Sequence, residues 1–165
     1  IGVDMLEIAR MQHALDERTY FIRRLFTEDE RMYCEHTARP AEHYAGRFAA
    51  REAVLIALGL GFGNGVGIGD VSVVRDDLGR PHALLAGRAA EVAREQGVRE
   101  VALSISHTHD VAVANAVAVT DVVRPKPDEK EDAAKALAVS FKEARSVIDE
   151  LERVQETIMD TVDEA

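Results

Sequence analysis

Two carboxylates lie where carboxylates are unusual. Asp4 stands among apolar residues in a stretch typical of a strand, and Glu52 lies beside the apolar face of a predicted helix. A carboxylate near a core costs free energy unless it is paired with a base or bound to a cation. Two oxygen ligands suit Mg²⁺ held against phosphate, because this ion keeps water molecules and takes only one or two protein carboxylates. Pairing with an arginine such as Arg47 or Arg51 is the alternative.

The glycine-rich loop, the paired histidines and the single cysteine are weaker candidates for a functional site. Alternate glycines from Gly59 to Gly69 form a loop, but neither the dinucleotide-binding motif nor the P-loop motif is present, so the pattern is typical of a flexible connection. His107 and His109, with Asp110 beside them, could supply zinc ligands, but so short a cluster is weak evidence and we do not expect a zinc site there. We interpret the single cysteine, Cys34, as a packed small residue.

The composition is that of one compact domain with an appendage. The chain has 165 residues, of which 47% are hydrophobic and 30% charged, and its formal net charge is −10. One cysteine excludes an intramolecular disulfide, and no apolar run is long enough to span a bilayer. We therefore expect a cytoplasmic protein that binds no membrane, and the acidic balance argues against nucleic acid as a partner.

The hydrophobic pattern predicts the elements that position these groups. We expect strands over 1–8, 71–75, 82–85, 101–105 and 111–120, and helices over 10–17, 27–37, 41–60 and 88–96. Thr27 followed by Glu30 is the signature of a helix N-terminus. A strand, helices, a hairpin, a helix and a second hairpin in this order indicate an α+β fold.

The composition changes after residue 120, where all four lysines lie. The two prolines at 125 and 127 are typical of an extended connector. We therefore divide the chain into a core (1–120), a proline-containing linker (121–128) and an acidic amphipathic helix (129–165). Apolar residues in this tail are spaced by threes and fours, so packing on the protein's own core and a self-associating coiled coil both remain open.

Four short motifs in one order are specific together, although none is specific alone. They are Gly2-Val3-Asp4 with Ile8, the RFAAREA segment from Arg47 to Ala53, Gly79-Arg80-Pro81, and the LSISHT segment from Leu103 to Thr108. Over residues 1–120 the chain resembles the bacterial holo-[acyl carrier protein] synthases, which are small 4'-phosphopantetheinyl transferases. The resemblance implies an antiparallel sheet packed with helices, in a homotrimer whose sites lie between subunits. It also implies Mg²⁺-dependent transfer of 4'-phosphopantetheine from coenzyme A to a serine of apo acyl carrier protein, a step of lipid metabolism such as fatty acid biosynthesis.

The resemblance assigns roles residue by residue. Asp4 and Glu52 match the family's magnesium ligands, and together with Arg51 they form the expected catalytic group. The expected coenzyme A-binding residues are Arg47, Arg51, Gly61, Arg80, Pro81, Ser106, His107 and Thr108. The acidic carrier protein is expected to dock on Arg10, Arg18, Arg23 and Arg24, where opposite charge favours association.

Two residues depart from the family pattern. The family's helix motif usually reads Lys-Glu-Ala with a second Lys four residues after the Glu, whereas this chain has Arg51 and Ile56 at these positions. Arginine keeps the positive charge but does not release a proton near neutral pH, and the isoleucine removes a phosphate contact. We hypothesise that Arg47 or Arg80 compensates. The alternative function is a non-catalytic relative that binds coenzyme A or the carrier protein as a scaffold, although retention of both metal ligands favours the enzyme.

Overall fold

The computed structural model describes residues 1–61, 65–122, 135, 137–148 and 150. The chain divides into two compact units, Ile1–Val123 and Arg124–Ala165. In the second unit residues 137–148 are helical. Most of the predicted linker and the end of the tail lie outside the described residues, so the division of the tail stays a prediction. Within the described ranges, no helix has the length and apolar character needed to cross a membrane, and the cytoplasmic location also stays a prediction.

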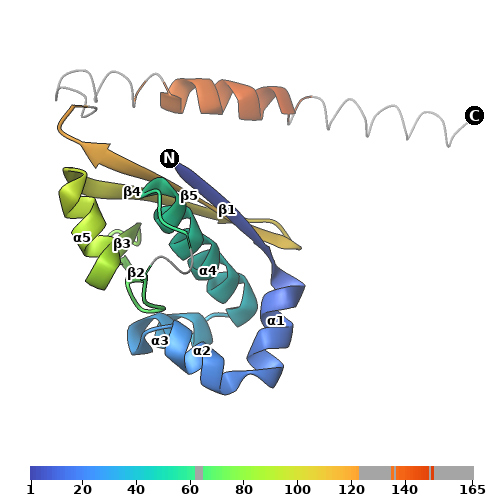
Figure 1. Cartoon of the computed structure of the whole chain (residues 1–165). Coiled ribbons are helices and arrows are strands. Elements are labelled where there is room, and N and C mark those ends of the chain that lie inside the picture. Colours follow the sequence, from blue (N-terminus) through green and yellow to red (C-terminus); the bar gives the residue numbers. More distant parts are fainter. Residues whose placement is uncertain (62–64, 123–134, 136, 149, 151–165) are drawn as a thin grey trace, which may run out of the picture. The chain divides into compact units, whose positions relative to one another are not determined.

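The first unit has the α+β fold that the sequence predicts (Figure 1). Its five strands form one sheet in the order β1-β5-β4-β3-β2, and every neighbouring pair is antiparallel. The elements in chain order are β1 (Gly2–Glu7), α1 (Ile8–Glu17), α2 (Thr19–Leu25), α3 (Glu28–Glu35), α4 (Pro40–Ala57), β2 (Val71–Arg75), β3 (Pro81–Leu85), α5 (Gly87–Glu95), β4 (Val98–His107) and β5 (Val111–Thr120).

Helix α4 lies across one face of the sheet, against β1 and β5 (Figure 1). Ala53 of the helix and Ala114 and Ala116 of β5 are fully buried in one apolar cluster. Small side chains on both surfaces let the helix and the sheet approach closely. At Gly2 a Cβ atom would lie only 1.9 Å from the carbonyl oxygen of Ala53, so only glycine fits there. The first strand therefore packs directly on the helix that carries Glu52.

Helices α1, α2 and α3 enclose a second apolar cluster beside α4. Its centre includes Phe26 and Tyr44, whose rings meet edge to face at 4.8 Å. The predicted N-terminus of α3 is confirmed: the Thr27 hydroxyl accepts from the Glu30 amide at 3.3 Å, and the Glu30 carboxylate accepts from the Thr27 amide at 2.9 Å. Cys34 is fully buried, and burial raises the pKa of its thiol to about 12, so it stays protonated at neutral pH.

Two local predictions need correction. Residues 19–25 form α2, which the sequence patterns did not predict; burial of Ile22 and Leu25 in the second cluster stabilises this short helix. Strand β4 is longer than the predicted 101–105, because its pairing with β5 continues to the His107–Ala112 pair. His107 therefore lies at the end of strand β4.

Candidate active site

The two predicted metal ligands lie on the facing surfaces of β1 and α4. Alternation along β1 turns Asp4 toward α4 together with Gly2, while Val3 and Met5 are exposed on the other side. Burial, and then the charge of Asp4, raise the pKa of Glu52 to about 7. Burial likewise raises the pKa of Asp4. The charge of Asp4 thus disfavours the ionisation of Glu52.

The arginine pairing that the sequence left open does not occur among the described residues, where neither Asp4 nor Glu52 forms an ion pair. The Oε1 atom of Glu52 is buried and has no hydrogen-bond partner. An unpaired buried carboxylate is costly, and a bound cation removes that cost. The described part of the chain contains no cluster of three or more potential ligands. A pair of carboxylates is the number of protein ligands that Mg²⁺ commonly takes, because this ion keeps much of its water shell.

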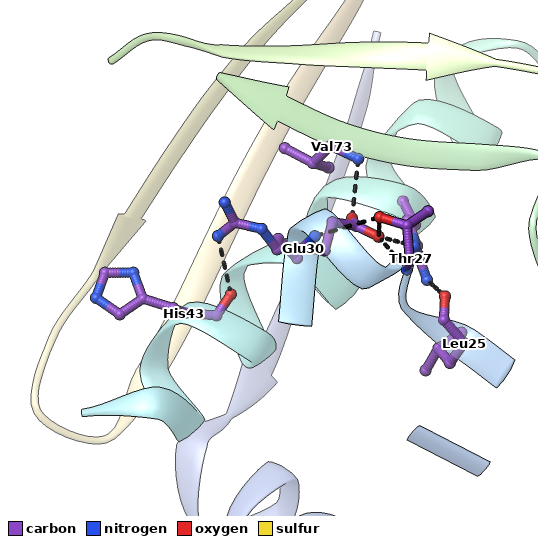
Figure 2. A network of polar contacts seen from close by, with 7 residues as sticks. Leu25, Thr27, Glu30, His43 and Val73 are labelled. Atoms are coloured by element: carbon purple, nitrogen blue, oxygen red, sulfur yellow. Dashed lines mark hydrogen bonds and ion pairs between the residues drawn. The ribbon is translucent and has the colours of Figure 1, made fainter. Parts of the chain in front are cut away.

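Arg51 belongs to a different, buried network (Figure 2). Its guanidinium donates to the Glu30 carboxylate at 2.5 Å and to the carbonyl oxygen of Leu25. The Arg51 and Glu30 side chains are only 5% and 0% exposed. Glu30 also accepts from the amides of Thr27 and Val73, both at 2.9 Å, so one carboxylate joins α3, α4 and β2. These contacts favour a structural role for Arg51, and its catalytic and coenzyme A-binding roles stay predictions.

A second site lies between α4 and the β2–β3 hairpin, in a cavity of about 180 Å³. The Tyr33 ring contacts two guanidinium groups there, with the Cζ atoms of Arg47 and Arg75 at 4.1 and 4.9 Å from its centroid. The rings of His43 and His107 are 6.1 Å apart. None of the described residues that line this cavity is acidic; they are Tyr33, His43, Arg47, Val73, Arg75, Gly79, Pro81, Ile105 and His107. Such a lining attracts anions; we call it the cationic cavity.

Arg47 supplies a buried positive charge to the cationic cavity. Arg47 is only 5% exposed, and its Nε atom has no hydrogen-bond partner. One of its terminal nitrogens donates to the carbonyl oxygen of His43 at 3.5 Å (Figure 2). Arg75 is held at the rim by the Gly79 carbonyl at 2.7 Å and by the Tyr33 hydroxyl at 2.5 Å. Guanidinium groups fixed in this way are suited to binding phosphate oxygens.

The structure brings together only part of the predicted coenzyme A set. Arg47, Pro81 and His107 line the cationic cavity. Ser106 lies on the opposite face of the sheet from His107, because successive strand residues alternate. Thr108 is exposed, and its hydroxyl accepts from the Val111 amide at 3.2 Å in the β4–β5 turn.

Three further positions of interest lie at the surface. Arg80 is exposed and donates to Asp76 at 2.7 Å, so its guanidinium is already paired at the hairpin tip. Gly61 is exposed after the end of α4. Ile56 is 48% exposed on α4, where the family usually carries a lysine. The coenzyme A-binding roles of Arg80 and Gly61 stay predictions.

Three polar or ionisable residues of the cationic cavity escaped the sequence analysis: Tyr33, His43 and Arg75. His43 had a local signal, because it lies one helical turn before Arg47 and so shares its side of α4. Tyr33 and Arg75 had none, because they come from α3 and β2 and meet only in the folded chain.

The predicted carrier-protein surface is accessible. Arg10, Arg18, Arg23 and Arg24 are all exposed, on α1, α2 and the residue between them. Tyr20 and Phe21 of α2 are also exposed, at 74% and 44%, and the guanidinium of Arg24 lies 5.9 Å from the Tyr20 ring centroid. This surface combines positive charge with aromatic side chains, a composition suited to an acidic protein partner.

Comparisons with known proteins agree on one family. A sequence model of the 4'-phosphopantetheinyl transferase superfamily matches residues 1–114. The holo-[acyl-carrier-protein] synthase of Caldanaerobacter subterraneus subsp. tengcongensis is 39% identical over 119 residues, which are 72% of this chain and 93% of that protein. The Bacillus anthracis holo-(acyl-carrier-protein) synthase, solved with CoA (3',5'-ADP), is 35% identical with a TM-score of 0.59, over 73% of this chain and 95% of that chain. The Helicobacter pylori enzyme in complex with coenzyme A is 25% identical with a TM-score of 0.62, over 72% and 98%.

Proposed function

The chain belongs to the 4'-phosphopantetheinyl transferase superfamily, and on this premise we propose that it transfers 4'-phosphopantetheine from coenzyme A to a serine hydroxyl of apo acyl carrier protein. The products are the holo carrier protein and adenosine 3',5'-bisphosphate. The observation that carries the proposal is the pair formed by Asp4 and Glu52, two desolvated carboxylates that no base among the described residues neutralises. If this pair of acids had only a structural role, its burial would destabilise the fold with no compensating interaction.

Asp4 and Glu52 are the residues that would hold Mg²⁺. The unpartnered Oε1 atom of Glu52 and the raised pKa of both carboxyls fit a cation-binding pair. When bound, Mg²⁺ supplies positive charge that stabilises the pyrophosphate of coenzyme A during phosphoryl-type transfer. The carboxylate of Glu52 is also proposed to receive the proton of the attacking serine hydroxyl.

The cationic cavity is the part of the chain best suited to the remaining phosphate of coenzyme A. Arg47 and His107 line it, in agreement with the roles that the family resemblance assigns to them. The small cavity beside Glu52 is separate and is lined by other residues, including Leu25, Phe48 and Ile68. We propose that in the assembled enzyme a metal pair from one chain and a cationic cavity from a neighbouring chain serve the same coenzyme A molecule.

That assembly is proposed to be a homotrimer. The sheet face turned away from α4 exposes the apolar side chains of Val3, Met5, Leu84 and Val117. An exposed apolar patch on a sheet favours association with another protein surface. Light scattering on the purified protein is expected to give three times the chain mass of 18.1 kDa; a monomer that retains transferase activity would contradict the shared site.

The surface of α1 and α2 is proposed to bind the acyl carrier protein. Replacing Arg24 by Ala is expected to raise the KM for the carrier several-fold with little change in kcat, because rim charges mainly affect association. The effect should shrink at high salt. Arg99→Ala, at an exposed arginine of β4 that pairs with Asp121, is the matched control and should leave this KM unchanged.

The direct test is to mix the purified protein with coenzyme A, Mg²⁺ and apo acyl carrier protein, and to weigh the carrier by mass spectrometry. We expect the mass gain of one phosphopantetheine group, lost with EDTA and with Glu52→Gln. Glu91→Gln, at an exposed carboxylate of α5 that pairs with Arg88, should keep the activity. Coenzyme A binding without any carrier adduct would refute the transferase and support the scaffold alternative.

A further inference from the structure

The cationic cavity contains an ionisable residue that the family motifs do not include, His43. We propose that His43 is a further ligand-binding residue, which takes up a proton when a phosphate monoester enters the cavity and thereby makes the protein select coenzyme A over its 3'-dephospho form. This inference rests on the proposed function, because it takes coenzyme A as the ligand.

The geometry holds the imidazole of His43 at the wall of the cavity. The ring is half-buried, 5.3 Å from the Tyr33 ring at an interplanar angle of 88°, and 6.1 Å from the His107 ring. The Tyr33 ring is fixed in turn by the cation–π contact with Arg47 and the hydrogen bond from Arg75. The imidazole therefore needs little reorganisation when a ligand arrives.

The charges around His43 favour its neutral form while the cavity is empty. Burial, then the positive charges of Arg47 and His107, and more weakly that of Arg75, lower the pKa of His43. Tyr33, from α3, is the other titratable group in contact with the ring. The neighbouring carboxylate, Glu42, opposes this shift, but burial, Arg47 and His107 each have a larger effect on the pKa of His43.

Glu42 is already engaged by other groups. It pairs with Arg39 at 2.5 Å, and its second oxygen lies 3.7 Å from His107 Nδ1. The cavity thus holds more positive charge than its neighbouring carboxylate compensates.

A phosphate monoester matches this charge pattern better than the pyrophosphate does. A monoester approaches two negative charges near neutral pH, because its second pKa is about 6. Entry of such an anion offsets the field of Arg47 and Arg75 and attracts a proton to His43. The cavity of about 180 Å³ is smaller than the roughly 300 Å³ at which pockets for whole organic ligands begin, so it suits one phosphate group. The 3'-phosphate is the monoester of coenzyme A.

The pH dependence follows from this linkage. Ligand binding takes up a proton only between the pKa of His43 in the free protein, which lies below its ordinary value of about 6.5, and its higher pKa in the complex. Across that interval the Kd for coenzyme A should rise with pH, by at most about tenfold per pH unit for one proton. The Kd for 3'-dephospho-coenzyme A should not show this rise.

The test is isothermal titration calorimetry of the full chain with coenzyme A and with 3'-dephospho-coenzyme A. Two buffers of different ionisation enthalpy count the protons taken up, from about pH 6 to about pH 8. We expect wild type to take up a proton with coenzyme A only, and to bind it at least about tenfold more tightly than the dephospho form at the acidic end. His43→Phe, which keeps an aromatic ring against Tyr33, should lose the uptake and most of this preference. His13→Phe, at an exposed histidine of α1, is the control and should keep both.

The possible outcomes separate this inference from the proposed function. Unchanged proton uptake and selectivity in His43→Phe would overturn the role of His43, while continued transfer to the carrier would leave the transferase proposal standing. His43→Gln, which keeps a polar group of similar size, guards against a packing artefact and should show the same loss of uptake as His43→Phe. Failure of the wild-type protein to bind coenzyme A at all would overturn both proposals.

Discussion

Two acidic residues at helix α4, Glu30 and Glu52, differ in whether their carboxylate oxygens have hydrogen-bond partners. Glu30 packs against it from α3 and is 1% exposed, yet both of its carboxylate oxygens accept hydrogen bonds and one is paired with Arg51. Glu52 belongs to the helix itself, has a buried oxygen without a partner, and lies near a second acid, Asp4. Each carboxylate has a buried oxygen, so hydrogen bonding is what separates a structural carboxylate from one available to a cation.

The same contrast explains why one departure from the family pattern is tolerated. Arg51 and Glu52 are consecutive, so their side chains leave α4 about 100° apart. The two terminal nitrogens of the Arg51 guanidinium donate to two acceptors at once, the Glu30 carboxylate and the carbonyl oxygen of Leu25. An arginine at this position therefore strengthens the support of α4 without removing the carboxylate pair.

The largest expected effect is on stability. Glu30→Gln should lower the free energy of unfolding by about 3–5 kcal/mol, because it leaves the buried guanidinium of Arg51 without a counter-charge. Urea denaturation at one protein concentration measures this change. Glu28→Gln, an exposed residue in the first turn of the same helix, is the control and should change stability by less than about 1 kcal/mol. Equal losses in the two variants would show that the network contributes nothing special.

The next largest effect is on activity, and here Glu52 matters more than Glu30. Glu52→Gln should lower kcat/KM for carrier modification by about a hundredfold or more, because it removes one charge that would hold the metal. Its free energy of unfolding without metal should be unchanged or higher, since an unpaired buried carboxylate is gone. A stability loss as large as that of Glu30→Gln would erase the distinction between the two acids.

The pH dependence of stability sharpens the comparison further. Because the pKa of Glu52 is about 7 in the folded chain and near 4.5 when unfolded, the folded state binds the extra proton between these values. Stability in EDTA should therefore fall as pH rises from about 4.5 to about 7, by on the order of 1 kcal/mol after allowance for solvent screening. Comparing unfolding in EDTA with and without Glu52→Gln isolates this slope, and identical slopes would remove Glu52 as its source.

The smallest effect is expected from restoring the family residue. Arg51→Lys keeps the ion pair with Glu30 but loses the hydrogen bond to the carbonyl oxygen of Leu25. This loss should lower the free energy of unfolding by about 1 kcal/mol. Transferase activity should stay within a few-fold of wild type when assayed well below the melting temperature. A large change in kcat with unaltered stability would instead give Arg51 a direct part in the reaction.

Much of the core was readable from local sequence. The period of apolar residues predicted α4 and all five strands, and the Thr27–Glu30 cap of α3 was visible because a capping box is a contact between residues three apart. Helix α2 was not predicted, because its few turns are stabilised by packing of Ile22 and Leu25 and not by propensity. The motif residues Asp4 and Glu52 were identified as a pair before their proximity was known.

What the sequence by itself determined, then, is the order of elements, the family motifs and the two acids that stand in apolar surroundings. Only the tertiary structure decided which charges are paired. The partner of Arg51 lies 21 residues earlier in the chain, and the cationic cavity joins residues of α3, α4, β2 and β4. Such contacts depend on how helices and strands pack across long stretches of chain, and no local period or short motif records them.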